Sequence, residues 1–272
     1  MLTLARAMAK GGSTGDPLPT VFSPLERAGV RPRRGQVTMV VGIPNSGKSA
    51  FAQWYASELA RRHSLSGLYF SADTDVGTIV RRQLAMLTGQ DQRVIEHEMT
   101  GPGAGYYEDL LTQVSGIRWV FEASPTLDDI DLEMAAFEEL HGVYPDVVYV
   151  DNILNVAFDN GDEWSSIREL SKVLHHLARE TGCAFFALHH ATEATGRPEY
   201  PPARKDIQGK IAQMPELILS IARSGGEFRV ACTKNRSGPA DPTGREYTTL
   251  YADLDRMQFL SSRYEAQSAG VA

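Results

Sequence analysis

A short apolar run that leads into a glycine-rich pattern is the feature that most constrains how this 272-residue chain can fold. The run covers residues 37–41, and the pattern G-x-x-x-x-G-K-[ST] follows it from Gly42 to Ser49. Behind the pattern, apolar residues recur at spacings of three and four over positions 51–59, as in an amphipathic helix. The segment therefore predicts a strand, a tight loop and a helix in direct succession, which is the context in which this pattern binds phosphate groups.

Each fixed position of the pattern has a physical reason. Gly42 and Gly47 let the backbone turn tightly and bring its N–H groups close to phosphate oxygens, and the N-terminus of the following helix favours negative charge. The Lys48 ammonium can reach the β- and γ-phosphates, and the Ser49 hydroxyl can bind Mg²⁺. A chance match to the pattern alone is expected in on the order of one chain in a hundred of this length. We therefore expect a nucleotide site that is formed by Gly42, Pro44, Asn45, Ser46, Gly47, Lys48, Ser49 and Ala50.

Strand and helix signals alternate from this loop to about residue 191. The expected strands cover residues 67–73, 117–123, 146–152 and 183–191, and the main helices between them cover 76–89, 126–142 and 165–182. This alternation predicts an α/β fold with a mainly parallel sheet and helices on both faces. From about residue 215 the pattern changes to successive strands at 216–224, 227–235 and 247–255, separated by Gly and Pro turns. We therefore expect antiparallel strands at the C-terminal edge of the sheet.

The chain length and composition fit one globular domain. We expect a flexible segment at residues 1–20, one domain over 21–260 and a mobile tail at 261–272. The net charge of −7 argues against a protein that coats itself in nucleic acid, although it allows a local basic groove.

The sequence indicates no membrane partner. No apolar run approaches the roughly 20 residues that span a bilayer, and the N-terminus is too weakly apolar for a secretory signal. Cytoplasmic localisation is therefore the default expectation.

Two acidic residues end predicted strands and complete the expected nucleotide site. Asp151 follows a buried strand in "VVYVDN", where a carboxylate can hold Mg²⁺ and its water together with Ser49. Asp73 ends the strand after the first helix, where a carboxylate can orient the water that attacks a phosphate. The alternative role of Asp73 is to cap the helix at 76–89. Asp75 is the second candidate for orienting the water.

Five segments, in order, resemble the RecA-like ATPase core, and in particular the C-terminal motor domain of DnaB-type replicative helicases. The segments are "GIPNSGKS", "YFSADT", "VVYVDN", "FFALHH" and "CTKNRSG", and the resemblance covers roughly residues 20–260. The resemblance implies a RecA-like P-loop NTPase fold, ATP and Mg²⁺ as cofactors, and ATP hydrolysis as the activity.

The resemblance also assigns roles at two strand ends. The family's catalytic glutamate falls on Asp73, which is one methylene shorter. The glutamine that senses the γ-phosphate in the family falls on His190, and a neutral histidine can donate one hydrogen bond in its place. Without the resemblance, His189 and His190 are simply a polar strand end.

The segment from Lys234 to Gly238 resembles the family's basic finger, which enters the nucleotide site of a neighbouring subunit. Lys234 and Arg236 would then stabilise the charge on the transferred phosphoryl group, which requires a homo-oligomeric ring, a hexamer by the family's pattern. The alternative is a basic β-turn. The full set of expected catalytic residues is Lys48, Asp73, Asp151, His190, Lys234 and Arg236.

A Pro- and Gly-rich segment at 191–213 corresponds to the family's channel loop, which touches single-stranded DNA. We expect this loop to be mobile. Tyr200 could stack on a base, and the basic residues could contact phosphates. The alternative is a solvated loop. The expected DNA-binding residues are Arg197, Tyr200, Arg204, Lys205 and Lys210.

The leading functional hypothesis is an ATP-dependent motor that acts on single-stranded or branched DNA in replication or recombination. One alternative is a recombination mediator of the RadA kind, and another is a KaiC-like regulatory ATPase that binds no DNA. A further alternative is a metal-dependent nuclease acting on branched DNA, with carboxylates at Asp151, Asp159, Asp162 and Glu163.

Overall fold

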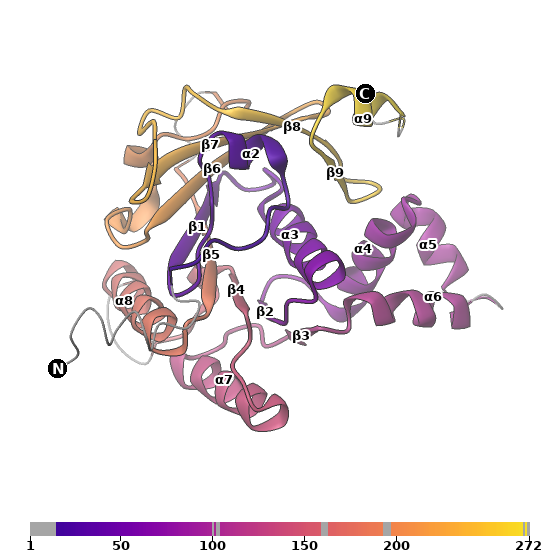
Figure 1. Cartoon of the computed structure of the whole chain (residues 1–272), viewed down its shortest axis with the longest axis horizontal. Coiled ribbons are helices and arrows are strands. Elements are labelled where there is room, and N and C mark those ends of the chain that lie inside the picture. The colour runs from indigo at the N-terminus through magenta and orange to yellow at the C-terminus, as the bar shows by residue number, and fades with distance from the viewer. Residues whose placement is uncertain are drawn as a thin grey trace.

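The computed structural model describes residues 15–99, 101, 104–158, 163–192, 197–268 and 270, apart from the side chains of Glu163 and Lys210. These residues form a nine-stranded sheet with the order β3-β2-β4-β5-β1-β6-β7-β8-β9 (Figure 1). The strands are β1 (Val37–Gly42), β2 (Gly67–Ser71), β3 (Ile117–Val120), β4 (Val147–Asp151), β5 (Ala184–His190), β6 (Leu217–Ser224), β7 (Glu227–Asn235), β8 (Thr248–Asp253) and β9 (Gln258–Leu260).

The first six strands in this order are parallel, and the last three continue the sheet in antiparallel fashion. Strands that are buried on both faces read as continuous apolar runs, and all residues of β1, β2 and β4 are buried. The predicted α/β class, with a mainly parallel sheet and an antiparallel C-terminal edge, is confirmed.

Helices cover both faces of the sheet (Figure 1). They are α2 (Ser23–Arg27), α3 (Lys48–His63), α4 (Val76–Thr88), α5 (Gln92–Glu98), α6 (Ala104–Leu111), α7 (Leu127–His141), α8 (Glu163–Thr181) and α9 (Arg263–Ser268). Alternate strand residues point to opposite faces. Tyr69 and Phe186 therefore pack with α2 and α3, whereas Phe70 and Phe185 pack with α7 and α8.

Some elements lie outside the sequence-based expectations. The short elements α2, β9 and α9 were not predicted, and α9 lies in the tail that was expected to be mobile, with Ala266 fully buried. Leu18 is buried, so packing begins before residue 21. None of the helices in the described part of the chain is long and apolar enough to cross a membrane.

The expectation of a mobile segment at 191–213 is corrected for residues 197–213. Pro201 and Pro202 are buried, and Ile207 and Ile211 join the core beneath α8. Ile207 also forms a β-bridge with Ala191, directly after β5. Residues 193–196 lie outside the described part. The composition of this segment indicated a loop, but the two isoleucines anchor it to the sheet.

Phe51 is the centre of the aromatic packing that fixes α3 to the sheet. It is fully buried, and its ring lies 5.4 Å from Phe228, 5.6 Å from Phe22 and 6.0 Å from Phe259, measured between centroids. Because α3 begins at Lys48, this packing also holds the start of the helix in place.

We expect Phe51→Ala to lower the free energy of unfolding by about 3–5 kcal/mol, because the large side chain leaves a cavity that the aromatic neighbours cannot close. Urea unfolding followed by circular dichroism measures the change. Leu132→Ala is the control, since Leu132 is 66% exposed on α7 and its removal should change stability by less than about 0.5 kcal/mol. Equal effects of the two substitutions would contradict this account of the core.

Candidate active site

The candidate site lies at the carboxyl ends of four neighbouring parallel strands. β1 ends at Gly42, β4 at Asp151 and β5 at His190, and β2 ends two residues before Asp73. β5 pairs with both β1 and β4, and β4 pairs with β2, so the residues at these strand ends gather at one edge of the sheet. The structure therefore brings together five residues that the sequence analysis selected separately: Lys48, Ser49, Asp73, Asp151 and His190.

The loop between β1 and α3 leaves no room for side chains at its two key glycines. A Cβ on Gly42 would collide with the Ser46 hydroxyl, and a Cβ on Gly47 would lie 3.1 Å from the Phe228 ring. Gly47 also has a φ of +92°, a conformation that residues with a Cβ rarely adopt. Both positions therefore favour glycine, because the loop packs closely against Ser46 and the Phe228 ring.

Lys48 is buried, and its ammonium group forms hydrogen bonds with other residues of the chain. It donates hydrogen bonds to the carbonyl oxygens of Gly42, at 3.1 Å, and Ile43, at 3.0 Å, and its Nζ lies 3.3 Å from His190 Nδ1. Burial lowers the pKa of Lys48 to about 8, and the nearby charges of Asp151 and Asp73 act in the opposite direction. Phosphate oxygens at this loop would replace the carbonyls with negatively charged acceptors and favour the charged lysine.

Ser49 and Asp151 meet where a divalent cation would be held. The Ser49 hydroxyl donates to Asp151 Oδ1 at 3.0 Å, and the Tyr69 hydroxyl donates to Asp151 Oδ2 at 2.8 Å. Burial raises the pKa of Asp151 to about 6, against the opposing effect of both hydroxyl donors. The sequence analysis missed Tyr69, because its side chain reaches the site from the middle of β2 and no local pattern marks that contact.

Asp73 belongs to a network with two asparagines. Asn152 donates to one Asp73 oxygen at 2.9 Å, and Asn155 donates to the other at 2.6 Å. Asp75, and not Asp73, caps α4, through a hydrogen bond from the Thr78 N–H. The capping role is thereby assigned to Asp75, and Asp73 points instead toward the residues after β4. Asn152 and Asn155 were missed, although Asn152 directly follows Asp151 in the sequence.

The two adjacent histidines have different surroundings. His189 is fully buried, and its Nε2 lies 3.1 Å from the carbonyl oxygen of Gln208. His190 lies between Lys48, on its Nδ1 side, and Asn152, whose Nδ2 is 3.4 Å from its Nε2. Burial and the Lys48 charge lower the pKa of His190. A neutral ring accepts at only one nitrogen, so only one of these two contacts is a hydrogen bond at a time.

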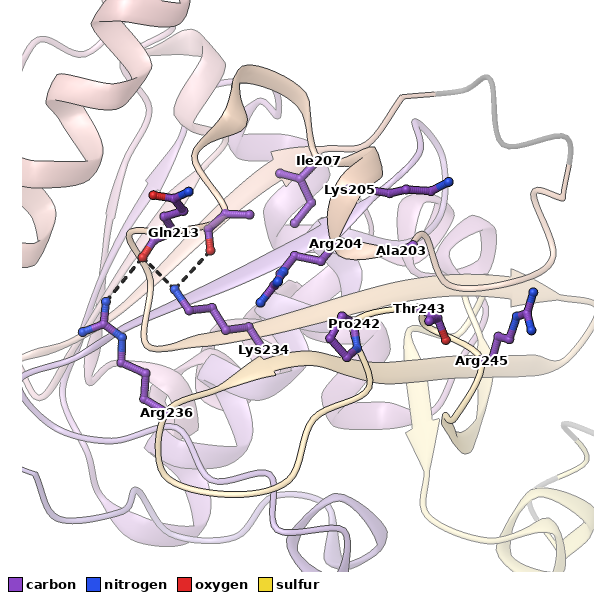
Figure 2. A pocket seen from close by; sticks show the side chains of 11 residues that line it. Ala203, Arg204, Lys205, Ile207, Gln213, Lys234, Arg236, Pro242, Thr243 and Arg245 are labelled. Atoms are coloured by element: carbon purple, nitrogen blue, oxygen red, sulfur yellow. Dashed lines mark hydrogen bonds between the residues drawn. The ribbon is translucent and has the colours of Figure 1, made fainter.

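The basic pair Lys234 and Arg236 lies at the opposite end of the sheet. The Arg236 N–H donates to the carbonyl oxygen of Glu216, and the Glu216 N–H donates to that of Val37, the first residue of β1. The phosphate loop follows the other end of β1, which is about 16 Å away for five residue steps. Both side chains are tied down locally. Lys234 Nζ donates to the carbonyl of Gln213 at 2.7 Å, and Arg236 donates to the same carbonyl at 3.3 Å (Figure 2).

The five expected DNA-binding residues do not form one cluster. Arg204 and Lys205 line a cleft of about 920 Å³ together with Lys234 and Arg236 (Figure 2), whereas Arg197 and Tyr200 line an adjoining pocket that shares Ala203, Thr243 and Arg245 with this cleft. The Lys210 side chain lies outside the described part. The Arg229 guanidinium lies 5.0 Å from the centroid of the Tyr200 ring, and Tyr247 contacts that ring edge-on. A base could therefore stack only on the ring face that Arg229 leaves open.

The Asp151 carboxyl is expected to weaken the fold of the nucleotide-free protein at neutral pH. Its pKa in the folded chain is about 6, above the ordinary value of 3.8. The folded state therefore holds this proton more tightly, and stability falls as the pH rises through the window between these values. Above the window, the cost is on the order of 3 kcal/mol.

We expect Asp151→Asn, which carries no charge, to have a higher free energy of unfolding than the parent at about pH 7.5. The difference should shrink toward zero near about pH 3, where the parent carboxyl is protonated in the folded state and largely so in the unfolded state. Urea unfolding at a series of pH values tests this. A variant that is less stable than the parent at every pH would show that the charge of Asp151 is not penalised.

Comparisons with known proteins agree with this geometry. Residues 18–196 match an AAA domain family. The gene 65 protein of Mycobacterium phage L5 is 34% identical over 270 residues, which cover 95% of this chain and 98% of that protein. The gene 65 protein of Mycobacterium phage D29 is 32% identical over 234 residues, which cover 82% of this chain and 97% of that protein.

Two solved structures share the fold at 16% sequence identity. One is an ATPase domain, which superimposes with a TM-score of 0.80 over 96% of both chains. The other is a DnaB-like replicative helicase, from a structural study that also describes its interactions with primase. It superimposes with a TM-score of 0.79 over 94% of this chain and 66% of that chain. The predicted likeness to the DnaB motor domain is thereby confirmed at the level of the fold. The chain belongs to the AAA domain family and is a P-loop ATPase with a RecA-like core.

Proposed function

We propose that this ATPase is a DNA-acting motor of the helicase-like, strand-handling kind, whose ATP sites are completed between copies of the chain. The observation that carries the proposal is the separation of the two halves of the catalytic apparatus. The phosphate loop follows the carboxyl end of β1, whereas Arg236 is linked through Glu216 to the amino end of the same strand. A single chain cannot bring these groups to one phosphate, but two copies packed side by side can.

The residues of the first half fit ATP with Mg²⁺. Hydroxyl and carboxylate oxygens are ligands that Mg²⁺ prefers. The Ser49 hydroxyl oxygen and Asp151 Oδ1 lie 3.0 Å apart, so both could bind the same ion. The buried Lys48 ammonium and the narrow glycine loop are suited to the phosphates. Mg²⁺ bound there would neutralise negative charge on the phosphate oxygens.

The network at Asp73 would orient the attacking water. A carboxylate that accepts from Asn152 and Asn155 is held in one position, while its exposed side remains open to solvent. His190 would contact the terminal phosphate. Its ring now lies against Lys48, so a nucleotide that draws the lysine toward its phosphates would also free His190 Nδ1.

The DNA part of the proposal is supported by the shared fold of the DnaB-like replicative helicase and by the cations of segment 197–205. The nuclease alternative stays a prediction, because three of its four carboxylates have no described side chain. Asp159 and Asp162 lie outside the described residues, as does the Glu163 side chain.

The first test separates nucleotide binding from turnover. We expect Lys48→Ala to lose ATP binding, because it removes the cation that contacts the phosphates. Arg236→Ala should keep ATP binding and lose turnover on the order of a thousandfold, because its contact is made with a neighbour's transferred phosphoryl group. Steady-state hydrolysis and titration with a fluorescent ATP analogue measure the two effects. Normal turnover by Arg236→Ala would contradict the completion of sites between copies.

The second test asks whether DNA is the substrate of the motor. We expect single-stranded DNA to stimulate hydrolysis, and its affinity to fall steeply between about 50 and 200 mM salt, because the contacts are made with phosphates. Stimulation with strand separation supports a helicase, and stimulation without it supports a mediator. A complete absence of DNA binding at low salt would overturn the DNA assignment and favour the regulatory ATPase.

A further inference from the structure

The cleft of about 920 Å³ runs from Lys234 and Arg236, near the amino end of β6, to Ile207, which bridges to Ala191 at the carboxyl end of β5, and it is strongly basic (Figure 2). Its described lining includes five cations and no acidic residue; the cations are Arg204, Lys205, Lys234, Arg236 and Arg245. From the sequence, Lys234 and Arg236 were expected to contact a neighbour's nucleotide, and Arg204 and Lys205 were expected to contact DNA. The structure places these two groups in one cleft.

Arg204 differs from the other loop cations in its direction. In Figure 2 its side chain extends toward Lys234, whereas Lys205 and Arg245 point away from Lys234. The charges are close enough to interact, because Arg236 and Arg204 both contribute to the lowered pKa of Lys234, after burial as the largest cause. Three like charges from two separate segments therefore face the same space.

The neighbouring groups leave these charges only partly balanced. Glu216 is the nearby carboxylate, and it is shared among Arg236 at 3.6 Å, His175 at 3.1 Å and the Val37 N–H at 3.1 Å. Lys234 is held by the carbonyls of Ala212 and Gln213. Within the described residues, the Arg204 guanidinium forms no hydrogen bond or ion pair that would neutralise it. An anion in the cleft would relieve the repulsion.

The backbone of Arg204 is nevertheless fixed. Its N–H donates to the carbonyl of Pro242 at 2.9 Å, and Asp206 accepts from the Ala203 N–H at 3.1 Å. A Cβ on Gly244 would lie 2.8 Å from the carbonyl oxygen of Pro201, so the turn at 241–246 packs directly on this segment. Contact with a ligand would therefore require ordering of the Arg204 side chain but not of its backbone.

We propose that Arg204 is a third cation of the site that Lys234 and Arg236 present to the ATP of a second copy, where its guanidinium contacts a phosphate oxygen. This inference rests on the proposed function and assigns Arg204 to the nucleotide instead of DNA. A triphosphate concentrates several negative charges in one place, as the three cations concentrate positive charge. A DNA strand, by contrast, carries single charges at intervals.

The test is complementation between inactive variants. Arg204→Ala keeps its own phosphate loop, and Lys48→Ala keeps Arg204. Arg204→Ala alone should hydrolyse ATP about a hundredfold more slowly than the parent, the effect of removing one preorganised donor to a developing charge. Lys48→Ala alone should be nearly inactive, because it loses ATP binding. An equimolar mixture should recover up to about a quarter of the parent rate, because about a quarter of the interfaces then combine an intact loop with an intact Arg204.

A parallel mixture of Arg236→Ala with Lys48→Ala separates the two proposals. Recovery in this mixture, but not in the Arg204→Ala mixture, would overturn the inference and leave the proposed function standing. Recovery in neither mixture would overturn the completion of sites between copies, and the inference with it. Recovery in both supports the assignment of Arg204.

Two further measurements distinguish a contact with the neighbour's nucleotide from a contact with DNA or a general loss of activity. Arg204→Ala should keep the parent affinities for a fluorescent ATP analogue and for single-stranded DNA. A loss of DNA affinity with unchanged hydrolysis in the absence of DNA would return Arg204 to the DNA site. Arg223→Ala, which removes an exposed arginine at the far end of β6, is the control and should hydrolyse ATP at the parent rate.

Discussion

The hydrogen bond between Ser49 and Asp151 is the contact on which the active site depends. It joins the start of α3, which follows β1 and the phosphate loop, to the end of β4, and β5 lies between β1 and β4 in the sheet. Strand ends separated in this way leave a crevice, which is where open α/β sheets bind their ligands. Both Asp151 and the adjacent Lys48 are buried. Burial raises the pKa of Asp151 and lowers the pKa of Lys48, so it favours the neutral form of each. Phosphate groups would therefore favour the charged form of Lys48, and a cation would favour the charged form of Asp151.

The opposite end of the sheet carries the complementary arrangement. The phosphate-loop end needs negatively charged phosphates, and the cleft beside Glu216 presents cations that no described carboxylate fully balances. Because the two ends lie about 16 Å apart along β1, the same rigid sheet can serve two different nucleotides. In an assembly, the basic end of each copy could lie against the phosphate loop of the next copy. The phosphates bound at that loop would then balance the cations of the neighbouring copy. Such a head-to-tail contact closes into a ring when its rotation permits.

Local patterns were sufficient to predict the parallel core, the phosphate loop and the position of Asp151, because each is encoded within one strand–loop–helix segment. The partners of these residues were not predictable, since they come from distant elements. Tyr69 reaches the site from the middle of β2 and Asn155 from the turn after β4, and their types alone do not distinguish them from packing or turn residues. The grouping of Arg204 with Lys234 likewise depends on how segment 197–213 folds back over the sheet. Composition indicated a loop there, whereas two buried isoleucines determine its course.

The central claim is that one chain holds an ATP site that only another copy can complete. The most direct measurement is the specific ATPase activity of the parent protein on dilution, with the fraction of assembled copies followed by mass photometry at the same concentrations. The account predicts that activity per chain falls in parallel with the assembled fraction and that the isolated chain is nearly inactive. A monomer that hydrolyses ATP at the rate of the assembly would contradict it.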